Sequence, residues 1–410
     1  MEKKVMILAG GNDQIALIEE LRRYFKGNVK ILLVDMSDKV RAIPFADKFL
    51  QISTMDKAAV LEAARREKID YILTACGDQP LSTMVYVATE LGLPTYLSEQ
   101  DVRDLTNKRF MKEKMVESGI PTAKHIYINK DWDGVLPDFN YPLVVKPVDS
   151  NGSKGVKKVC SISELDNALK EAFSYSLSGD VIIEEFISGE ELSVDVYVEG
   201  TTAKILSITA SKKIQENRDS FTIIQSYYPA PTDYKEECIL EICQKIADAW
   251  HLHDTPLLVQ MIHKGDCYSV LEFSARMGGG SKYRLIQVLS GVDIMKVYVE
   301  MVMGERPHVA PEKQYNNAIM SYIYCSPGVY KSVEGLETLK ANGFILEYFI
   351  YRESNTLIEK SNTSSDRAAG FLIVGDCQQE VENKLRIANN YLRVLDDTGK
   401  DIMRHDLFGF

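Results

Sequence analysis

The chain has 410 residues, which is too long for one compact core and predicts two or three domains. Apolar residues make up 45% and charged residues 26% of the sequence, a balance that excludes a disordered or fibrous protein. A formal net charge of -11 argues against nucleic acid and anionic membranes as partners. It leaves room for anionic small molecules, because a site can gather a few basic residues.

The cysteines and the N-terminus predict a cytoplasmic protein. Seven cysteines are scattered along the chain without a CxxC pair, which indicates reduced thiols rather than a disulfide framework or a zinc ribbon. No stretch approaches the roughly 18–20 apolar residues that a membrane span requires. The N-terminal residues run directly into a strand-like segment, Val5–Ala9, without the apolar core and cleavage site of a signal peptide.

The N-terminal part, up to about residue 95, alternates short apolar runs with helical patterns, which predicts strand–helix–strand units around a parallel sheet. We expect strands at Val5–Ala9, Ile31–Asp35 and Tyr71–Ala75, and helices near Gln14–Phe25 and Leu81–Leu91. The glycines after the first strand belong to GGNDQ and not to the fuller GxGxxG pattern, so a dinucleotide site is not expected here.

The pattern changes after Gly92-Leu-Pro94, and a boundary is predicted near residue 306. The elements expected between these points are a charged helix at Lys108–Ser118, a strand-rich block over Ile126–Gly200, a helix near Pro231–His251, a hairpin over Leu257–Arg276 with its turn at Lys264–Asp266, and a helix over Leu285–Met303. Short strands and one late helix, Gln379–Leu392, are expected beyond the boundary.

A lysine lies at the end of a predicted buried strand, in Val144-Val-Lys-Pro-Val-Asp-Ser-Asn-Gly-Ser-Lys-Gly-Val156. Burying a lysine is costly unless its ammonium group meets an anion. The loop after Lys146 contains Gly152 and Gly155, and such a loop can bring backbone N–H groups close to phosphate oxygens. Many Gly/Ser loops are only hairpins, but the preceding lysine favours phosphate binding.

An acidic turn follows the next predicted strand, in Val181-Ile-Ile-Glu-Glu-Phe-Ile-Ser-Gly-Glu-Glu-Leu-Ser-Val194. Three apolar residues deliver Glu184 to the interior side of the strand end, and the chain turns at Ser188-Gly189 before two more acids. Taken alone, this segment is explained equally well as a solvated turn between strands.

A third motif is Leu271-Glu-Phe-Ser-Ala-Arg-Met-Gly-Gly-Gly280, in which the period of two brings Glu272, Ser274 and Arg276 to one strand face. A hard-cation ligand beside a guanidinium group suits ATP chemistry, because magnesium bridges phosphates and arginine stabilises developing charge. Gln260 lies on the neighbouring strand of the predicted hairpin, where its oxygen could join Glu272 at the metal.

The order of these features resembles the ATP-grasp superfamily. The matching residues are Lys108 at the start of its helix, Lys146 with its glycine loop, Glu184-Glu-Phe-Ile187 with Glu191, and Gln260 with Glu272-x-Ser-x-Arg276. The similarity is to the branch that contains biotin carboxylase, the carbamoyl-phosphate synthetase large subunit and amino-acid ligases. It implies an N-terminal parallel α/β (pre-ATP-grasp) domain over 1–95, an ATP-grasp core over 96–305 with a mobile lid near 122–183, and a C-terminal α+β cap over 306–410.

The resemblance also implies a nucleotide site. Lys108 and Lys146 would hold the ATP phosphates under the loop 149–155, which includes Gly152, Ser153 and Gly155. The adenosine would be bound by Glu184 at the adenine amino group, by the backbone of Glu185 and Ile187 at the adenine edge with Phe186 between them, and by Glu191 at the ribose.

The implied metal ligands are Glu272 and Gln260, with Ser274, around one or two Mg²⁺ ions or Mn²⁺ in their place. Arg276 and Lys146 would be the catalytic residues, with Arg276 stabilising an acyl phosphate and the tetrahedral intermediate. Many members have Glu at the position of Gln260 and Asn at that of Ser274, so one carboxylate stands here where others have two. This difference puts a strong second metal site in doubt.

The acceptor side is expected along the glycine-rich segment Met277–Gly280, with Gly279 near the reacting acyl carbon. Lys282 is a candidate to pair with a substrate carboxylate, although a plain helix N-terminus explains it equally well. Arg218 is a further candidate for the substrate wall.

The resemblance implies an ATP-dependent carboxylate–amine ligase that forms an acyl phosphate, releases ADP and phosphate, and acts on an amino acid or small carboxylate. Its partners would be the small-molecule carboxylate and amine, and a homodimer is compatible with this reading. Two alternatives stay open: an enzyme that phosphorylates bicarbonate, like carbamoyl-phosphate synthetase or a carboxylase, and a nucleotide-binding protein without catalysis. The sequence does not identify the two substrates, because pocket walls vary freely on one fold.

Overall fold

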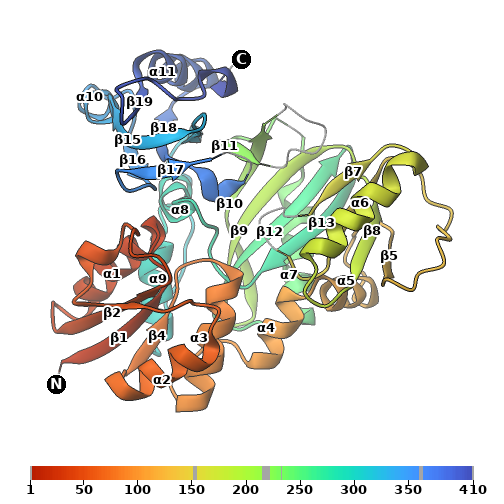
Figure 1. Ribbon diagram of the computed structural model, residues 1–410, viewed down its shortest axis with the longest axis horizontal. Coiled ribbons are helices and arrows are strands. Elements are labelled where there is room, and N and C mark those ends of the chain that lie inside the picture. Colours follow the sequence, from red (N-terminus) through yellow and green to blue (C-terminus); the bar gives the residue numbers. More distant parts are fainter. Residues whose placement is uncertain (1, 151–154, 215–221, 232, 360–362, 409–410) are drawn as a thin grey trace.

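The computed structural model describes residues 2–150, 155–214, 222–231, 233–359 and 363–408. Within these residues the strands form a parallel N-terminal sheet, a large antiparallel sheet, a small antiparallel sheet in the region predicted as the lid, and a three-stranded C-terminal sheet (Figure 1). This architecture confirms the predicted mixture of α/β and α+β structure. No helix in the described ranges is long and apolar enough to cross a membrane.

The N-terminal sheet is parallel and has helices on both faces. Its strand order is β3 (Lys48–Gln51), β2 (Val29–Asp35), β1 (Lys3–Leu8), β4 (Tyr71–Leu73). Alternate residues of β1 face opposite sides. Val5 and Ile7 belong to the core with α1 (Asn12–Tyr24) and α9 (Ile294–Val302), and Met6 and Leu8 to the core with α2 (Lys57–Glu67) and α3 (Asp78–Leu91). Burial on both faces explains the continuous apolar run of this strand.

The predicted N-terminal strands and helices are confirmed with shifted ends, whereas β3, α2 and the short 3₁₀ helix η1 (Ile43–Phe45) were not predicted. Two further helices, α4 (Glu99–Thr106) and α5 (Lys108–Glu117), lead from this domain to the lid sheet. Asn107 ends the first and caps the second, since its side chain accepts a hydrogen bond from the backbone of Arg109 (2.9 Å). The cap places Lys108 at the first helical position.

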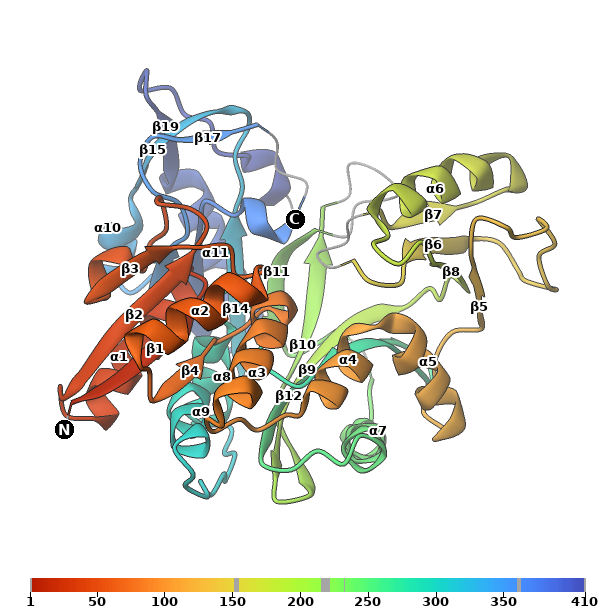
Figure 2. The same cartoon turned by 60° about the horizontal axis from the view of Figure 1, so that its bottom comes forward.

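The lid is a four-stranded antiparallel sheet in the order β5 (His125–Ile128), β8 (Val181–Glu185), β6 (Leu143–Pro147), β7 (Lys157–Val159). The helix α6 (Ile162–Tyr175), which the sequence did not predict, packs on this sheet through Leu165, Leu169 and Ala172. In two views the lid stands apart from the N-terminal sheet and the C-terminal part, on the far side of the large sheet (Figures 1 and 2).

The large sheet has eight strands in the order β13-β12-β9-β10-β11-β14-β18-β16. Their bounds are β9 (Glu190–Glu199), β10 (Thr202–Lys213), β11 (Ile223–Tyr228), β12 (Thr255–Lys264), β13 (Cys267–Ser274), β14 (Asn317–Ile323), β16 (Glu347–Ile350) and β18 (Ala369–Gly375). The predicted hairpin is confirmed as β12–β13. The last three strands in the order follow residue 306, so the predicted C-terminal cap shares a sheet with the core. The domain boundaries themselves remain predictions.

Helices pack against the strands of the large sheet. The predicted helix near 231–251 is α7 (Glu236–Ala249). The prediction of one helix over 285–303 is wrong, because α8 (Lys282–Ser290) ends at Gly291 and α9 begins after it. Gly291 adopts φ +72°, a conformation that closes a helix, and the Asp293 side chain caps the next one.

The remaining C-terminal elements lie beside the large sheet. They are the strands β15 (Gly328–Glu334), β17 (Thr356–Ile358) and β19 (Arg393–Asp396), the helices α10 (Leu336–Ala341) and α11 (Gln378–Tyr391), and the 3₁₀ helices η2 (Ser364–Asp366) and η3 (His405–Phe408). The predicted late helix is confirmed as α11.

Gly189 lies in the segment between β8 and β9, where the backbone comes very close to β12 of the large sheet. A Cβ atom on Gly189 would lie 2.4 Å from the carbonyl oxygen of His263 and 2.7 Å from Cγ2 of Ile262. The neighbouring residue, Glu190, is paired with His263 in the β9–β12 ladder, so the backbone cannot move away freely. Only glycine fits this approach without displacement.

We therefore predict that Gly189→Ala lowers the free energy of unfolding by about 1–3 kcal/mol, the usual cost of overpacking. Urea denaturation followed by circular dichroism measures the change. The control is Gly328→Ala in β15, where the added Cβ would meet its nearest neighbour at 3.4 Å and needs no shift. An unfolding midpoint of Gly189→Ala equal to that of wild type would contradict the close contact.

Candidate functional site

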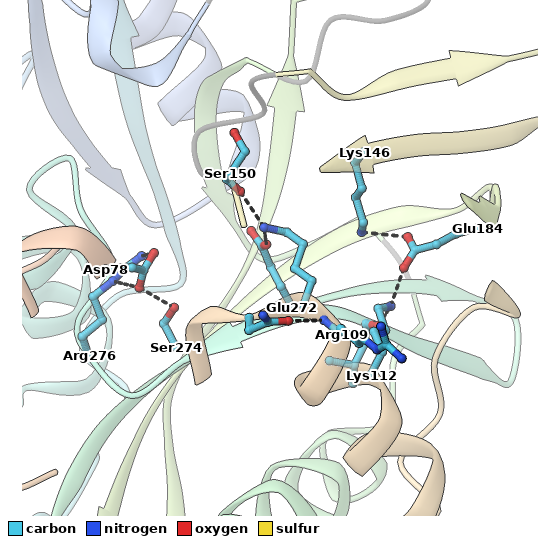
Figure 3. A network of polar contacts seen from close by, with 12 residues as sticks. Asp78, Arg109, Lys112, Lys146, Ser150, Glu184, Glu272, Ser274 and Arg276 are labelled. Carbon is cyan, nitrogen blue, oxygen red and sulfur yellow. Dashed lines mark hydrogen bonds and ion pairs between the residues drawn. The ribbon is translucent and has the colours of Figure 1, made fainter. Parts of the chain in front are cut away.

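The two predicted phosphate-binding lysines come from different elements, and Figure 3 shows Lys146 with the partners of both, Glu184, Ser150 and Glu272. Lys108, at the start of α5, donates from Nζ to the backbone carbonyl oxygen of Ser150 (2.6 Å) and lies 3.8 Å from a Glu272 carboxylate oxygen. Lys146, on β6 of the lid, places Nζ 2.7 Å from Glu184. Both lysine side chains are largely buried.

A third lysine, which sequence analysis missed, completes this cluster. Lys112 follows Lys108 by one helical turn and is fully buried. Its Nζ is 3.1 Å from the second oxygen of Glu184, an ion pair without hydrogen-bond geometry. It also donates to Thr122 Oγ1 and to the carbonyl oxygen of Val270 (3.3 Å). The i, i+4 spacing to Lys108 is the signal that could have identified it.

The buried carboxylate of Glu184 thus lies between Lys112 and Lys146, which come from the core and the lid (Figure 3). Burial alone would raise the pKa of Glu184, but the two ammonium groups lower it to about 2. Burial lowers the pKa of Lys112, and Glu184 opposes that effect. With one carboxylate and two cations, the cluster has one surplus positive charge, which suits an anionic ligand.

The residues predicted to bind adenosine lie along the connection from β8 to β9. Glu185 ends β8, and its side chain accepts from the backbone N–H of Asn140 (2.9 Å). Phe186 has the Nζ of Lys158 3.7 Å above its ring centre, and Ile187 follows outside either strand. Glu191 lies on β9, largely buried, and is ion-paired with Lys213. The adenosine roles of these residues, and that of Glu184, stay predictions.

The glycine-rich loop is only partly described. Gly152 and Ser153 lie outside the described residues, whereas Gly155 precedes β7 and adopts φ +71°. A Cβ atom on Gly155 would lie 2.9 Å from the Tyr175 ring and 3.0 Å from Pro147. The positive φ and the tight surroundings together require glycine at this position.

The predicted metal ligands share one strand face. Gln260 and Glu272 are directly paired across the β12–β13 ladder, and exposure alternates from Glu272 through Ser274 to Arg276, as the period of two predicts. The side chain of Glu272 is 47% exposed, so its carboxylate is open to a ligand. Gln260, Glu272 and Ser274 line one cavity with Lys108 and Arg276.

These donors fit a Mg²⁺ ion that is completed by substrate oxygens. Magnesium in phosphate chemistry takes one or two protein carboxylates together with phosphates and water. Glu272 supplies such a carboxylate and Gln260 an amide oxygen beside it. No group of three or more His, Cys, Asp or Glu side chains arranged for a metal occurs in the part of the chain that the structure describes. An all-protein cage is therefore not built here.

Arg276 is held by a carboxylate from the N-terminal domain. Its Nε and Nη2 donate to the two oxygens of Asp78 (2.7 and 2.9 Å), and Ser274 Oγ donates to the same group (2.8 Å; Figure 3). Burial would raise the pKa of Asp78, but the guanidinium group lowers it to about 2. Asp78 begins α3 after Gly77, at the end of β4, and sequence analysis missed it. A carboxylate that follows a strand and a glycine was the available signal.

The glycine-rich segment after Arg276 is anchored by a second N-terminal carboxylate. Asp13 accepts from the backbone N–H groups of Gly280 (3.2 Å) and Ser281 (2.8 Å) and from the Cys76 thiol (3.3 Å). Gly279 is exposed between these anchors, with room for a Cβ atom 3.5 Å from the Cys76 sulfur. The predicted acceptor position of Gly279 is therefore accessible.

The pairing of Lys282 with a substrate carboxylate stays a prediction, and the described residues already give this lysine partners within the protein. Its side chain is buried beneath the glycine segment, where Nζ donates to Ser193 Oγ (2.5 Å) and lies 3.4 Å from Asp195. The backbone of Ser281, at φ +61°, turns the first residue of α8 toward the sheet. Arg218, the other predicted wall residue, lies outside the described residues.

The sequence of this chain is similar to a known protein family and to known proteins. Residues 139–283 match the family model of the ATP-grasp domain. The chain is 25% identical over 350 residues to a phosphoribosylamine–glycine ligase of Pyrococcus furiosus, covering 80% of this chain and 77% of that one. Residues 139–283 are thus similar to an ATP-grasp domain, and this relative, similar over most of the chain, is a ligase.

Solved structures share the fold of this chain. An L-amino acid ligase from Bacillus licheniformis superposes with a TM-score of 0.78 at 20% identity, covering 96% of this chain and 99% of the other. The biotin carboxylase domain dimer of the 2-oxoglutarate carboxylase from Hydrogenobacter thermophilus, in complex with MgADP, ADP and bicarbonate, also has a TM-score of 0.78, at 15% identity. That match covers 99% of this chain and 92% of the other.

We predict that the buried cluster makes stability depend on pH through Glu184. Its pKa of about 2 lies below that of an unfolded glutamate, so its stabilising effect is present above about pH 4.3 and is lost as the pH falls toward 2. Glu184→Gln should lower the free energy of unfolding at pH 7 by about 3–5 kcal/mol, because two buried ammonium groups lose their partner. It should also flatten the decline between pH 5 and pH 3. Urea unfolding at each pH measures both effects.

The matched control is Glu241→Gln, which removes an exposed ion pair with Lys245 on α7. This variant should keep the acid decline of the wild type. A Glu184→Gln decline as steep as that of wild type would contradict the assignment.

Proposed function

We propose that this ATP-grasp ligase joins a carboxylate to an amine through an acyl phosphate, releasing ADP and phosphate, and that the carboxylate belongs to an amino acid or another small molecule. The observation that carries the proposal is the convergence of Lys108, Glu272 and Arg276 on one cavity. A cation for phosphate, a carboxylate for magnesium and a guanidinium for oxyanion charge are the groups that such a transfer uses.

In the first step, a substrate carboxylate oxygen bonds to the γ-phosphorus of ATP, the bond to the bridging oxygen breaks, and ADP leaves. Lys108 and Lys146 bind the phosphates and lower the cost of bringing two anions together. Glu272 and Gln260 would hold Mg²⁺, which neutralises phosphate charge when bound. The lid sheet, which carries Lys146, would exclude water from the reacting atoms.

In the second step, the amine attacks the acyl carbon, phosphate leaves, and the amine loses a proton. Arg276 is suited to stabilise the oxyanion that forms, because its charge is fixed and oriented by Asp78. Gly279, exposed and without a side chain, leaves space for the approaching amine. The named relatives support this reaction class, since one is a phosphoribosylamine–glycine ligase and another an L-amino acid ligase.

The likeness to a biotin carboxylase domain bound to bicarbonate favours a second candidate, phosphorylation of bicarbonate. The two candidates share the nucleotide site and differ in the acid that is activated.

The same likeness, to a dimer, motivates the proposal that this chain forms a homodimer. The proposed ion is Mg²⁺, and we propose that Mn²⁺ can take its place.

We predict that Glu272→Gln reduces ATP turnover by at least about 100-fold, because the substrate phosphates lose the carboxylate that binds their metal. Circular dichroism should show an unchanged fold, since Glu272 is exposed. ADP release is measured with Mg²⁺ and a mixture of amino acids, with Glu241→Gln as the control of equal charge change. Activity near that of wild type at saturating Mg²⁺ would remove Glu272 from the metal site.

We predict that ATP, Mg²⁺, hydroxylamine and the correct carboxylate give a hydroxamate and ADP in equal amounts. Hydroxylamine intercepts an acyl phosphate without needing the amine pocket. Arg276→Ala should lose this product by about 100- to 1,000-fold, because the oxyanion goes unpaired. The control is Arg65→Ala, which removes an exposed guanidinium group on α2.

The nucleotide product decides between the candidates. AMP in place of ADP overturns the acyl-phosphate proposal. ADP release that requires bicarbonate and gives no hydroxamate from any organic acid moves the chain to the carboxylase class. Nucleotide binding without turnover under all conditions supports a non-catalytic protein.

A further inference from the structure

A second arginine lies against the glycine-rich segment that follows Arg276. Arg367 follows η2 and precedes β18, so it comes from the C-terminal part of the chain. The centre of its guanidinium group is 3.6 Å above the ring of Tyr322, and its Nε lies 3.3 Å from the hydroxyl of Tyr324. Two tyrosines of the large sheet and its continuation therefore fix the orientation of Arg367.

The contact with the glycine segment is close. Nη1 of Arg367 lies 2.2 Å from the point where a Cβ atom on Gly280 would stand, so the guanidinium group occupies the place of a side chain at that position. Gly280 adopts φ +76°, and its carbonyl oxygen accepts from the Tyr322 hydroxyl (3.0 Å). Arg367 and the segment that follows Arg276 thus form one continuous surface.

Arg367 has no carboxylate within ion-pair distance among the residues that the structure describes. Three other arginines in the described ranges do have such a partner: Arg276 pairs with Asp78, Arg284 with Glu347, and Arg352 with Asp366. Asp13 is near enough to feel the charge of Arg367, but its oxygens already accept from Cys76 and the backbone. A largely enclosed guanidinium group without a counter-ion is costly, and an anionic ligand would remove the cost.

The tyrosines do not compete for such a ligand. The Tyr322 hydroxyl is donated to Gly280, the Tyr324 hydroxyl to the carbonyl oxygen of Ile223 (2.9 Å), and the Tyr351 hydroxyl to Ser281 Oγ (3.1 Å). The Tyr322 ring covers one face of Arg367, while the Nη groups of Arg367 keep donors for an oxyanion. Tyr322 and Tyr324 fix the orientation of Arg367, and Arg367 supplies the positive charge for the ligand.

The distance to the reacting centre fits a small substrate. Arg276 and Gly280 are four residues apart, so their Cα atoms are separated by at most roughly 14 Å. Exposed Gly279 lies between them. A molecule that spans from Arg367 to the acyl carbon near Arg276 would have the size of an amino acid or a short peptide, with its anionic group at one end and its amine at the other.

We propose that Arg367, held by Tyr322 and Tyr324 beside Gly280, binds the anionic group of the amine substrate and thereby points its amine at the acyl phosphate. This inference rests on the proposed ligase function. The ligand class is an amine that carries an oxyanion, and both a carboxylate and a phosphate monoester have the chemistry that Arg367 recognises. Arg367 determines specificity for the second substrate, and Arg276 serves the reacting atoms.

The first test compares amines that differ only in charge. With the carboxylate found by hydroxamate formation, wild type, Arg367→Gln and Arg367→Lys are assayed with an amino acid, its amide, an aminoalkyl phosphate and hydroxylamine. We expect Arg367→Gln to lose at least tenfold more kcat/KM with the anionic amines than with the amide or hydroxylamine, mainly through KM. Arg367→Lys, which keeps the cation but not the paired donors, should fall between. The control is Arg386→Gln on the outer surface of α11.

The anionic amine that shows the larger effect identifies the ligand: the amino acid points to a carboxylate and the aminoalkyl phosphate to a phosphate monoester. An equal loss with the amino acid and its amide, in a variant whose thermal unfolding matches that of wild type, overturns the proposal. A loss confined to the carboxylate substrate would also overturn it, because Arg367 would then serve the other half of the reaction.

A second measurement tests anion binding at Arg367 without catalysis. Binding of an α-hydroxy acid and of inorganic phosphate is followed by thermal shift, with wild type and Arg367→Gln side by side. We expect at least one of the two anions to stabilise wild type and to lose at least tenfold in affinity in the variant. Equal binding by both proteins, or no binding to wild type, overturns the subsite even if the ligase reaction is found. Failure of every carboxylate to give a hydroxamate, with the subsite intact, would overturn the proposed function alone.

Discussion

The buried carboxylate of Glu184 between two lysines is the interaction on which the arrangement of the site depends. Lys112 belongs to the helix α5 and Lys146 to the strand β6, so one carboxylate ties α5 to the small sheet in the region predicted as the lid. All three side chains are buried, and any one left alone would be a buried charge, which makes each partner necessary to the other two. The cluster therefore holds β6, and with it Lys146, at a defined position relative to α5.

The charge around the site is opposite in sign to the net charge of the chain. The protein carries a formal net charge of -11, yet Lys108, Lys112, Lys146, Arg276 and Arg367 gather around the cavity and its glycine-rich border. Carboxylates neutralise three of these cations only in part, because Glu184 serves two lysines and Glu272 is 3.8 Å from Lys108. The local surplus suits a nucleotide, while the remaining surface keeps its acidic character.

The sequence was sufficient wherever the relevant residues belong to one short segment. Strand alternation predicted the common face of Glu272, Ser274 and Arg276, and the turn residues Lys264–Asp266 predicted the hairpin that brings Gln260 opposite Glu272. These relations depend on a period of two and on a turn, which are local properties.

The residues that were missed have partners from distant segments. Asp78 meets Arg276 across 198 positions, and no local pattern specifies that approach. Lys112 looked like an ordinary helix residue because its partner, Glu184, lies on the distant strand β8. Lys282 also has distant partners, since Asp195 and Ser193 lie beneath it in the sheet and are 87 and 89 positions away. Tertiary packing decided these positions, not propensity.

The continuity of the large sheet across residue 306 has a consequence for how the chain can be divided. A fragment that stopped near residue 305 would retain β11 but lose β14, whose residues from Ala318 to Ser321 pair with it. The freed edge would present a row of unpaired N–H and C=O groups beside buried side chains such as Ile224, which is a template for association with other chains. In the full chain β14 covers this edge, so the C-terminal part also protects the sheet that carries β12 and β13.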